Sequence, residues 1–361
     1  MVPDAIDVAS LRRALVVKLR HHGDVLLASP VFAVLKNHAP QLEIDALVYD
    51  DTQEMLALHP AIAEVHTVGR AWRGLPLPRR LAAEWGLLRT LRARHYDLLV
   101  TLTEHPRGAS LARLLRPRWR VAPHQPDRGR FWRKSFTHLY RLPGNGRRHT
   151  VEVNLDALRR IGVYPGEEER RLVLVPGAEA TSAVTARLAS LGIAAAGFVH
   201  FHPASRWRFK CWPADRAAAL IDALARDNHA VVLTAAPSQP ELELVREILA
   251  RCRSTPIDLS GKLSLKALAA LTARAKLFVG VDSAPMHIAA AMGTPVVALF
   301  GPSGDVEWGP WRVRSRIVAS DAHPCRPCGN DGCGGGKVSE CLTTLPVERV
   351  YAAARELLAG R

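Results

Sequence analysis

Short runs of aliphatic and β-branched residues alternate along the chain with longer stretches whose apolar residues recur at helical spacing. This alternation is typical of parallel α/β units, in which a helix follows each strand and packs on the sheet. In the first half the pattern predicts strands at 14–19, 43–49, 64–68 and 97–102, and helices at 29–38 and 81–91. Ser29 and Pro30 open the first of these helices, as first-turn residues often do.

A second alternation of the same kind begins at residue 197. It predicts strands at 197–203, 229–236, 257–261, 276–282 and 295–301, helices at 213–226 and 239–251, and a further helix capped by Ser264. Pro, Gly and charged residues cluster around 163–181, which indicates a link between domains. We therefore predict an α/β protein with two doubly wound, Rossmann-like domains, 1–170 and 171–345, followed by a C-terminal helix, 346–361.

In open α/β sheets, ligands bind beyond the carboxyl ends of the strands. The first candidate loop follows the first strand and reads Arg20-His21-His22-Gly23-Asp24. Gly23 allows a close approach of a ligand to the backbone. Asp24 could cap the following helix, which the local sequence favours, or it could serve as a general base in an interdomain cleft.

Two further candidate loops lie in the second half. The segment 202–213 carries Ser205, Lys210 and two arginines just before a helix, where cations and the helix dipole both favour a diphosphate. An exposed basic loop with no ligand explains this segment equally well. In the segment 281–287, Asp282 and His287 flank small residues that would leave backbone N–H groups facing an anion.

Other nucleotide-binding motifs are missing from the sequence. No G-x-G-x-x-G follows the first strand, and residues 332–337 imitate a phosphate-binding loop but are followed by Val338 instead of Ser or Thr. The sequence has no Asp-x-Asp pair, so a Mg²⁺ bridge between protein and phosphates is not indicated. Cationic side chains and helix N-termini would have to stabilise a leaving diphosphate instead.

Composition and charge then narrow the range of partners. The content of 48% hydrophobic and 23% charged residues is typical of a globular protein, and neither a secretory signal nor an apolar run of about 20 residues is apparent. We therefore expect a cytoplasmic protein.

The net charge of +15 favours an anionic partner. Between residues 107 and 148, twelve Lys and Arg face one acid, Asp127, with aromatic residues interleaved. This basic segment suits a solvated surface, anionic lipid or nucleic acid, and composition does not separate the three.

Four of the six cysteines gather near the C-terminus, as Cys325, Cys328, Cys333 and Cys341. Disulfides are rare in a reducing cytoplasm, so these thiols either hold a structural metal ion or lie reduced in a Gly-rich loop. The spacing is irregular for zinc. A metal bound there would have no part in chemistry.

Three stretches carry a family resemblance: KLRHHGDVLLASPVFAVLK, FHPASRWRFKCWP and VGVDSAPMHIAAAMGTPVVALFGPSGDVEWGP. In this order and spacing they resemble the ADP-heptose–lipopolysaccharide heptosyltransferases, glycosyltransferase family 9, over nearly the whole chain. The first stretch is most similar to heptosyltransferases of type III, which add the branch heptose of the inner core. The resemblance implies a GT-B fold with two domains facing across a cleft. It also implies an inverting, metal-independent transfer without a cofactor, by a cytoplasmic enzyme peripheral to the inner membrane.

The resemblance also assigns roles to residues. Asp24 would be the general base, Lys210 would contact the donor phosphates and Ser205 would lie beside them. The residues implied to line the ADP-heptose site are Asp282, Ser283, Ala284 and His287. Candidates for binding the lipopolysaccharide acceptor are Arg20, His21, His22 and the basic segment. Two alternatives stay open: the same fold with another nucleotide sugar or acceptor, and a basic nucleic-acid-binding protein. The missing glycine fingerprint argues against a nicotinamide-dependent oxidoreductase.

Overall fold

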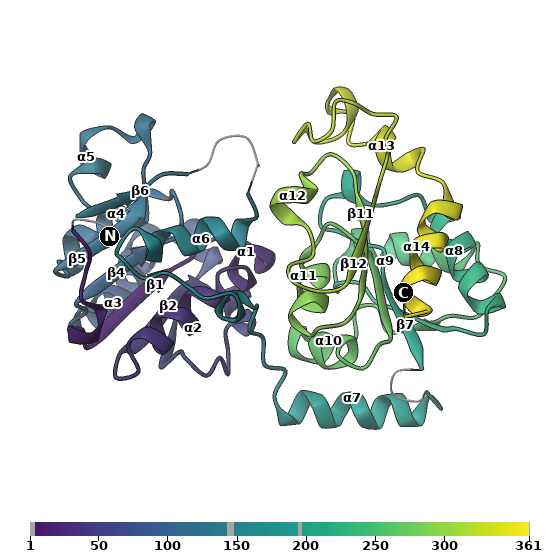
Figure 1. Cartoon of the computed structure of the whole chain (residues 1–361), viewed down its shortest axis with the longest axis horizontal. Helices are drawn as coiled ribbons and strands as arrows, with labels where there is room; N and C mark the ends of the chain where they lie inside the picture. Colours follow the sequence, from purple (N-terminus) through teal and green to yellow (C-terminus); the bar gives the residue numbers. More distant parts are fainter. Residues whose placement is uncertain (1–3, 143–147, 194–196, 361) are drawn as a thin grey trace. The chain divides into compact units, whose positions relative to one another are not determined.

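The computed structural model describes residues 4–142, 148–193 and 197–360. The chain divides into two compact units, Met1–Val175 (unit 1) and Pro176–Arg361 (unit 2), which are considered separately below (Figure 1). No helix within the described ranges combines the length and the apolarity that a membrane crossing demands.

Unit 1 is built on a six-stranded parallel sheet with the strand order β3-β2-β1-β4-β5-β6. Its strands are β1 (Arg13–Val17), β2 (Glu43–Tyr49), β3 (Glu64–Val68), β4 (Leu98–Thr101), β5 (Trp119–Pro123) and β6 (His138–Tyr140). Its helices of five or more residues are α1 (His22–Leu26), α2 (Ser29–His38), α3 (Leu77–Ala93), α4 (Pro106–Leu115), α5 (Gly129–Arg133) and α6 (Thr150–Arg159). The central strands β1 and β4 are almost wholly buried, as expected when helices cover both faces of a parallel sheet.

Unit 2 repeats this architecture with the strand order β12-β11-β10-β7-β8-β9. Its strands are β7 (Phe198–His202), β8 (Ala230–Leu233), β9 (Ile257–Asp258), β10 (Leu277–Val281), β11 (Val296–Phe300) and β12 (Ser315–Ala319). Its helices are α7 (Ala178–Ser190), α8 (Ala214–Arg226), α9 (Gln239–Leu249), α10 (Leu265–Thr272), α11 (Ala284–Ala291), α12 (Asp305–Trp308), α13 (Glu340–Thr343) and α14 (Val347–Leu358). The last helix, α14, packs on α8 and on the β10–β12 side of the sheet.

Both sheets have the same topology when their strands are counted from one: 3-2-1-4-5-6. The chain therefore reverses its direction of winding between β1 and β4 in unit 1, and between β7 and β10 in unit 2. Loops at such a switch point diverge and leave room for a ligand. The loops after these four strands are where the side chains of a site should be sought.

The predicted α/β class and the pair of doubly wound sheets are confirmed. The predicted bounds of α2, β2 and β3 coincide with the observed ones. The strands β5, β6 and β12 and the helices α4, α5, α6 and α7 were not predicted from the sequence. Most of these elements lie within the basic segment, where arginines interrupt the apolar pattern that would otherwise mark a strand or a helix.

One buried ion network joins β2, β3 and the segment before β4 in unit 1. Asp45 is fully buried and accepts hydrogen bonds from Arg94 Nε at 2.8 Å and from Tyr96 Oη at 2.7 Å. Burial alone would raise the pKa of Asp45, but the hydrogen bonds from His66, Arg94 and Tyr96 outweigh it and lower that pKa. Asp45, Glu64 and His66 are close enough together to bind one ion. Because Arg94 already supplies the positive charge, we interpret the cluster as structural.

Candidate active site

Asp24 lies in the first turn of α1, shortly after β1 at the switch point of unit 1. The residue at the N-cap of α1 is His21, so Asp24 is not the capping residue that its local sequence favours. Within the described parts of the chain, its half-buried carboxylate has no hydrogen bond or ion pair of its own. A carboxylate that is free and held on a helix has the properties of a base awaiting a substrate hydroxyl.

A buried lysine lies beside this helix. Lys18 follows β1 and is only 6% exposed; its Nζ donates to the carbonyl of Leu102 at 3.1 Å and to Asn154 Oδ1 at 3.0 Å. The Asn154 amide also donates to the carbonyl of Leu27 at 3.0 Å, and Leu27 is the C-cap of α1. One buried amide on α6 therefore ties the lysine to the end of the helix that carries Asp24.

Burial and neighbouring charges act on the pKa of Lys18 in opposite directions. Burial lowers the pKa of Lys18 to about 8, while the Asp24 and Glu104 carboxylates oppose that shift and Arg20 adds to it. Leu102 and Glu104 follow β4, so the lysine bridges the two loops of the switch point. The sequence analysis placed Lys18 inside a strand and assigned it no role.

A cationic pocket opens at the same edge of unit 1. It has a volume of ≈ 260 Å³, and its lining from the segments after β3 and β4 and from helices α3 and α4 includes Arg70, Arg73, Arg80, His105 and Arg107. Burial lowers the pKa of His105, and the nearby arginines at 107, 73, 128 and 20 lower it further. The pocket is therefore strongly positive and suits an anionic ligand.

The predicted acceptor residues adjoin this pocket. Arg70 Nη2 donates to the carbonyl of Arg20 at 3.0 Å, and Arg70 Nε donates to Asp51 Oδ2 at 2.6 Å. The His22 ring is hydrogen-bonded to the carbonyl of Asp51 at 2.9 Å, and His21 is the N-cap of α1. Of the residues that line this pocket, only Arg107 was a candidate from the sequence, as part of the basic segment. The others lie on elements that are far apart in the chain, so the sequence did not group them.

In unit 2 the structure brings two predicted donor residues together across the switch point. Lys210 lies in the loop after β7 and Asp282 follows β10, yet Lys210 Nζ donates to Asp282 Oδ2 at 2.6 Å. Lys210 also lies over the ring of Trp207, 5.3 Å from its centroid. Both charged groups are mostly buried, and the pair holds a cation at the carboxyl edge of the sheet.

The other predicted donor residues lie around this pair. Ser205 is buried after β7, and its Oγ accepts from the Trp207 amide at 3.4 Å. Ser283 is the N-cap of α11, and the helix begins at Ala284, within the small-residue segment that was expected to precede it. His287 is buried one turn further along α11. The N-terminus of α11 therefore opens beside the Lys210–Asp282 pair, where it favours negative charge.

A buried polar network holds the C-terminal end of β7, where the loop with Ser205 and Lys210 begins. Thr234 Oγ1 is hydrogen-bonded to His200 Nε2 at 2.7 Å and to His202 Nδ1 at 2.8 Å, and His200 Nδ1 meets Thr272 Oγ1 at 3.0 Å. Burial lowers the pKa of His202 to about 3, so this ring is neutral at physiological pH. The network fixes the end of β7, from which the donor loop departs, and it was not foreseen from the sequence.

Of the four C-terminal cysteines, Cys325, Cys328 and Cys333 are exposed and Cys341 is buried. This buried thiol lies on α13, and its pKa is raised by burial and by the three other cysteines. The Glu340 amide donates to Cys333 Sγ at 3.4 Å. Over the described residues, however, the only ligand set found within 4.8 Å is Asp45, Glu64 and His66, so the four sulfurs are not gathered about one point. A structural metal at the cysteines stays a prediction.

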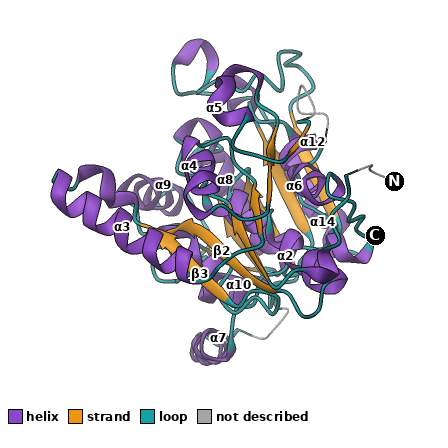
Figure 2. Ribbon diagram, turned by 90° about the vertical axis from the view of Figure 1, so that its left-hand side faces the viewer, coloured by secondary structure: helices purple, strands orange, loops and turns teal. Residues whose placement is uncertain are grey.

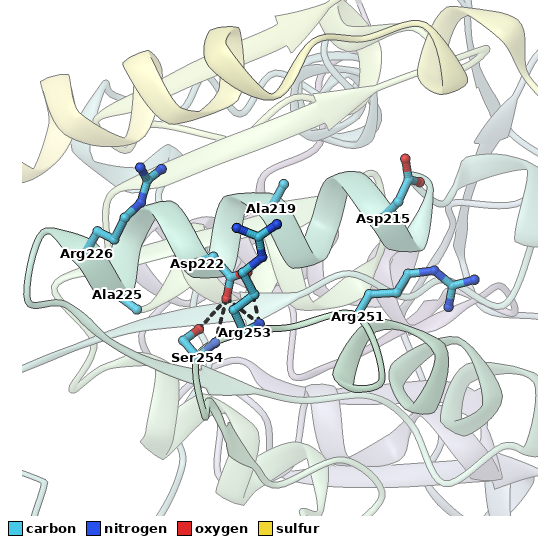
Figure 3. A pocket seen from close by; sticks show the side chains of 8 residues that line it. All are labelled: Asp215, Ala219, Asp222, Ala225, Arg226, Arg251, Arg253 and Ser254. Carbon is cyan, nitrogen blue, oxygen red and sulfur yellow. Dashed lines mark hydrogen bonds between the residues drawn. The ribbon is translucent and has the colours of Figure 1, made fainter.

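The large depression on unit 2 lies elsewhere. It measures ≈ 690 Å³ and is lined by α8 and by the segment that follows α9 (Figure 3). Its central carboxylate, Asp222, accepts from the amides of Arg253 and Ser254 and from Ser254 Oγ. These bonds anchor a loop and leave Asp222 engaged, so we assign the depression a structural role.

Two parallel sheets of the order 3-2-1-4-5-6, each with charged side chains at its switch point, form a fold of the GT-B class. Comparison with known proteins narrows this class. The family model "Glycosyltransferase family 9 (heptosyltransferase)" matches residues 85–338. Lipopolysaccharide heptosyltransferase 3 of Escherichia coli (strain K12) is 35% identical over 342 residues, which cover 94% of this chain and 96% of the relative. The chain belongs to glycosyltransferase family 9.

Solved structures agree with this fold. The family 9 glycosyltransferase of Veillonella parvula superposes with a TM-score of 0.84 at 24% identity, covering 99% of this chain and 100% of the other. The E. coli heptosyltransferase WaaC with ADP superposes with a TM-score of 0.74 at 20% identity, covering 96% and 99%. The predicted family and GT-B fold are thus confirmed, while a cleft between the two units stays a prediction.

Proposed function

We propose that this enzyme transfers heptose from ADP-heptose to the inner core of lipopolysaccharide, by an inverting and metal-independent reaction. The observation that carries the proposal is the free carboxylate of Asp24 at the switch point of unit 1. The Lys210–Asp282 pair at the equivalent place in unit 2 supports a nucleotide diphosphate there. The relative named lipopolysaccharide heptosyltransferase 3 supports this donor and acceptor.

In the proposed reaction, Asp24 accepts the proton of an acceptor hydroxyl while that oxygen attacks the anomeric carbon of the donor. The bond between the anomeric carbon and the phosphate oxygen breaks, and ADP leaves with the electron pair. Attack from the face opposite to the leaving group inverts the anomeric centre. Lys210 and the N-terminus of α11 would offset the charge that develops on ADP, so the transfer would need no metal ion.

The acceptor would bind to unit 1. Arg20, His21 and His22 adjoin the cationic pocket that Arg70, Arg73 and others line. Such a pocket fits the phosphate groups of a phosphorylated inner core, because guanidinium groups bind phosphate in a bidentate manner. On this assignment the enzyme works in the cytoplasm at the inner membrane face, with Ser205, Ser283, Ala284 and His287 around the donor.

A donor-by-acceptor assay tests the proposal. ADP-heptose and other nucleotide sugars would each be offered with defined core oligosaccharides, with and without EDTA, and the new linkage would be determined by NMR. We expect transfer from ADP-heptose alone, with inversion and without sensitivity to EDTA. Efficient transfer from another sugar nucleotide would favour the alternative donor. Tight RNA or DNA binding without transfer would favour a nucleic-acid-binding protein.

A further inference from the structure

Helix α3 presents large apolar side chains to solvent. Of its 17 residues only Leu91 is buried. Leu77, Leu81 and Trp85 are 65%, 58% and 62% exposed, and their spacing of four residues places them on one face of the helix. Exposed apolar residues occur singly on most proteins, but a row of three along one helix marks an interaction surface.

The exposed face continues into a groove between α3 and α4, which pack against each other on unit 1 (Figure 2). The groove has a volume of ≈ 210 Å³. Its apolar lining consists of Leu81, Trp85, Leu87, Leu88, Leu111 and Leu114. The hydrogen bonds from the Arg92 guanidinium to the carbonyl of Leu114 join the two helices near their C-terminal ends.

One end of the groove meets the cationic pocket of the candidate active site. Glu84 and Arg107 line both hollows, and their side chains form an ion pair that separates them. An apolar groove that adjoins a cationic pocket has the shape of a site for amphiphiles, with acyl chains on one side and phosphate on the other.

Positive charge surrounds the apolar face. Arg79, Arg80 and Arg89 are exposed on α3, and within the described ranges no carboxylate lies within 4 Å of any of them. The single acid of α3, Glu84, is already paired. On the neighbouring α5, Phe131 is 54% exposed, and the Arg113 guanidinium lies 4.4 Å from its ring centroid. Apolar side chains ringed by unpaired arginines are typical of helices that lie in the headgroup region of anionic bilayers.

We propose that the α3–α4 face docks on the surface of an anionic lipid bilayer, with Leu77, Leu81 and Trp85 entering the boundary between headgroups and acyl chains. A second copy of this chain fits less well. A two-fold contact through this face would bring the arginines of both copies together, and like charges at an interface oppose association. The inference rests on the proposed function only for the location of the acceptor.

Vesicle binding in the absence of donor and acceptor tests docking independently of transfer. The full-length protein would be co-sedimented with phosphatidylglycerol-containing vesicles, and with phosphatidylcholine vesicles as the neutral counterpart. We expect binding to the anionic vesicles that weakens as salt rises, because exposed charges are screened beyond about 8 Å at physiological ionic strength. Replacing Leu81 and Trp85 by Ser should weaken binding about 10-fold or more, since the change removes two apolar side chains that would enter the bilayer. Leu191→Ser, an exposed apolar residue of unit 2, serves as the matched control and should bind as the parent protein does.

Tryptophan quenching supplies a second readout with a conservative variant. Brominated acyl chains should quench the fluorescence of the parent protein, and Trp85→Phe should keep vesicle binding but lose most of that quenching. Unchanged binding of the Leu81→Ser/Trp85→Ser variant would overturn the proposal. So would a parent dimer that this variant dissociates without losing vesicle binding, because the face would then be a contact between copies of the chain.

Transfer separates this inference from the proposed function. The Leu81→Ser/Trp85→Ser variant should transfer more slowly to a lipid-anchored acceptor and at the parent rate to the delipidated oligosaccharide. Equal losses on both acceptors would assign the face to folding or to sugar binding and would contradict membrane docking. Failure of the parent protein to transfer heptose at all would count against the proposed function but would leave the vesicle result standing.

Discussion

The two units share a strand order but differ in the chemistry at the switch point. In unit 1 the carboxylate of Asp24 is free and a buried ammonium group, Lys18, lies nearby. In unit 2 the lysine and the aspartate are paired with each other, Lys210 with Asp282. The same backbone topology thus holds an unpaired carboxylate in one unit and a paired cation in the other. Side chains, and not the fold, divide the proposed labour between acceptor and donor.

The two units also differ in net charge. Unit 1 contains 28 Lys and Arg against 18 Asp and Glu, a net charge of +10, while unit 2 contains 21 against 16, a net charge of +5. The excess in unit 1 includes the arginines of the cationic pocket and those around the α3–α4 face. A unit that receives a phosphorylated, lipid-anchored acceptor would need this excess, whereas a unit that binds one nucleotide would need only a few cations.

The largest effect expected from this division is at Asp24. Asp24→Asn keeps the size of the side chain but removes its ability to accept a proton. We expect kcat to fall about 100-fold or more with the fold intact, as measured by steady-state transfer and thermal unfolding. Asp215→Asn removes an exposed first-turn carboxylate from α8 and should leave kcat unchanged. Near-parent turnover of Asp24→Asn would show that Asp24 is not the general base.

The low pKa of Lys18 should make the free energy of unfolding depend on pH. Its pKa is about 8 when folded and 10.5 in the ordinary state, so the unfolded chain binds more protons between these values and stability rises with pH across that window. Relative to Lys18→Met, which cannot titrate, the free energy of unfolding of the parent protein should rise by about 2 kcal/mol from pH 7 to pH 10. Urea unfolding at both pH values measures this, and a constant difference between the two proteins would show that the lysine is not held in a desolvated site.

A smaller effect is expected from the basic segment of unit 1. Neutralising Arg128, Arg130, Arg133 and Lys134 together should weaken binding to anionic vesicles, because each cation near such a surface contributes about 1 kcal/mol at low salt. Transfer to the lipid-anchored acceptor should slow by about three-fold at physiological salt, where screening reduces this contribution. Transfer to the delipidated oligosaccharide should be spared. Comparable slowing on both acceptors would place these cations in the sugar site instead.

Elements whose pattern is complete within a few residues could be predicted from the sequence. β2 is an apolar run interrupted only by Asp45, and α2 begins with Ser29-Pro30, so their observed bounds match the prediction. β5 was missed because Arg118 and Arg120 flank and interrupt a run of only five residues. A short strand of this kind is specified by its neighbour β4 in the sheet and not by its own sequence.

Only those parts of the site that adjoin a clearly patterned strand could be predicted from the sequence. Motif residues such as Lys210 and Asp282 could be placed at strand ends, because the strands before them are clear. Long-range partners could not be seen: Lys18 is bonded to groups 84 and 136 positions away in the chain. The cationic pocket draws on the segments after β3 and β4 and on helices α3 and α4, and only the order of the strands reveals that these parts of the chain meet.

The division between the units is tested most directly by titrating ADP into Asp24→Asn and Lys210→Ala side by side in an isothermal calorimeter. The account predicts that Asp24→Asn binds ADP as tightly as the parent protein, although its kcat is about 100-fold lower. It predicts that Lys210→Ala binds ADP about 10-fold more weakly, because a charged hydrogen bond to the diphosphate is lost, while Lys262→Ala, an exposed lysine of unit 2, does not differ from the parent. Unchanged ADP affinity in Lys210→Ala, or a loss of affinity in Asp24→Asn, would contradict the assignment of donor and base to separate units.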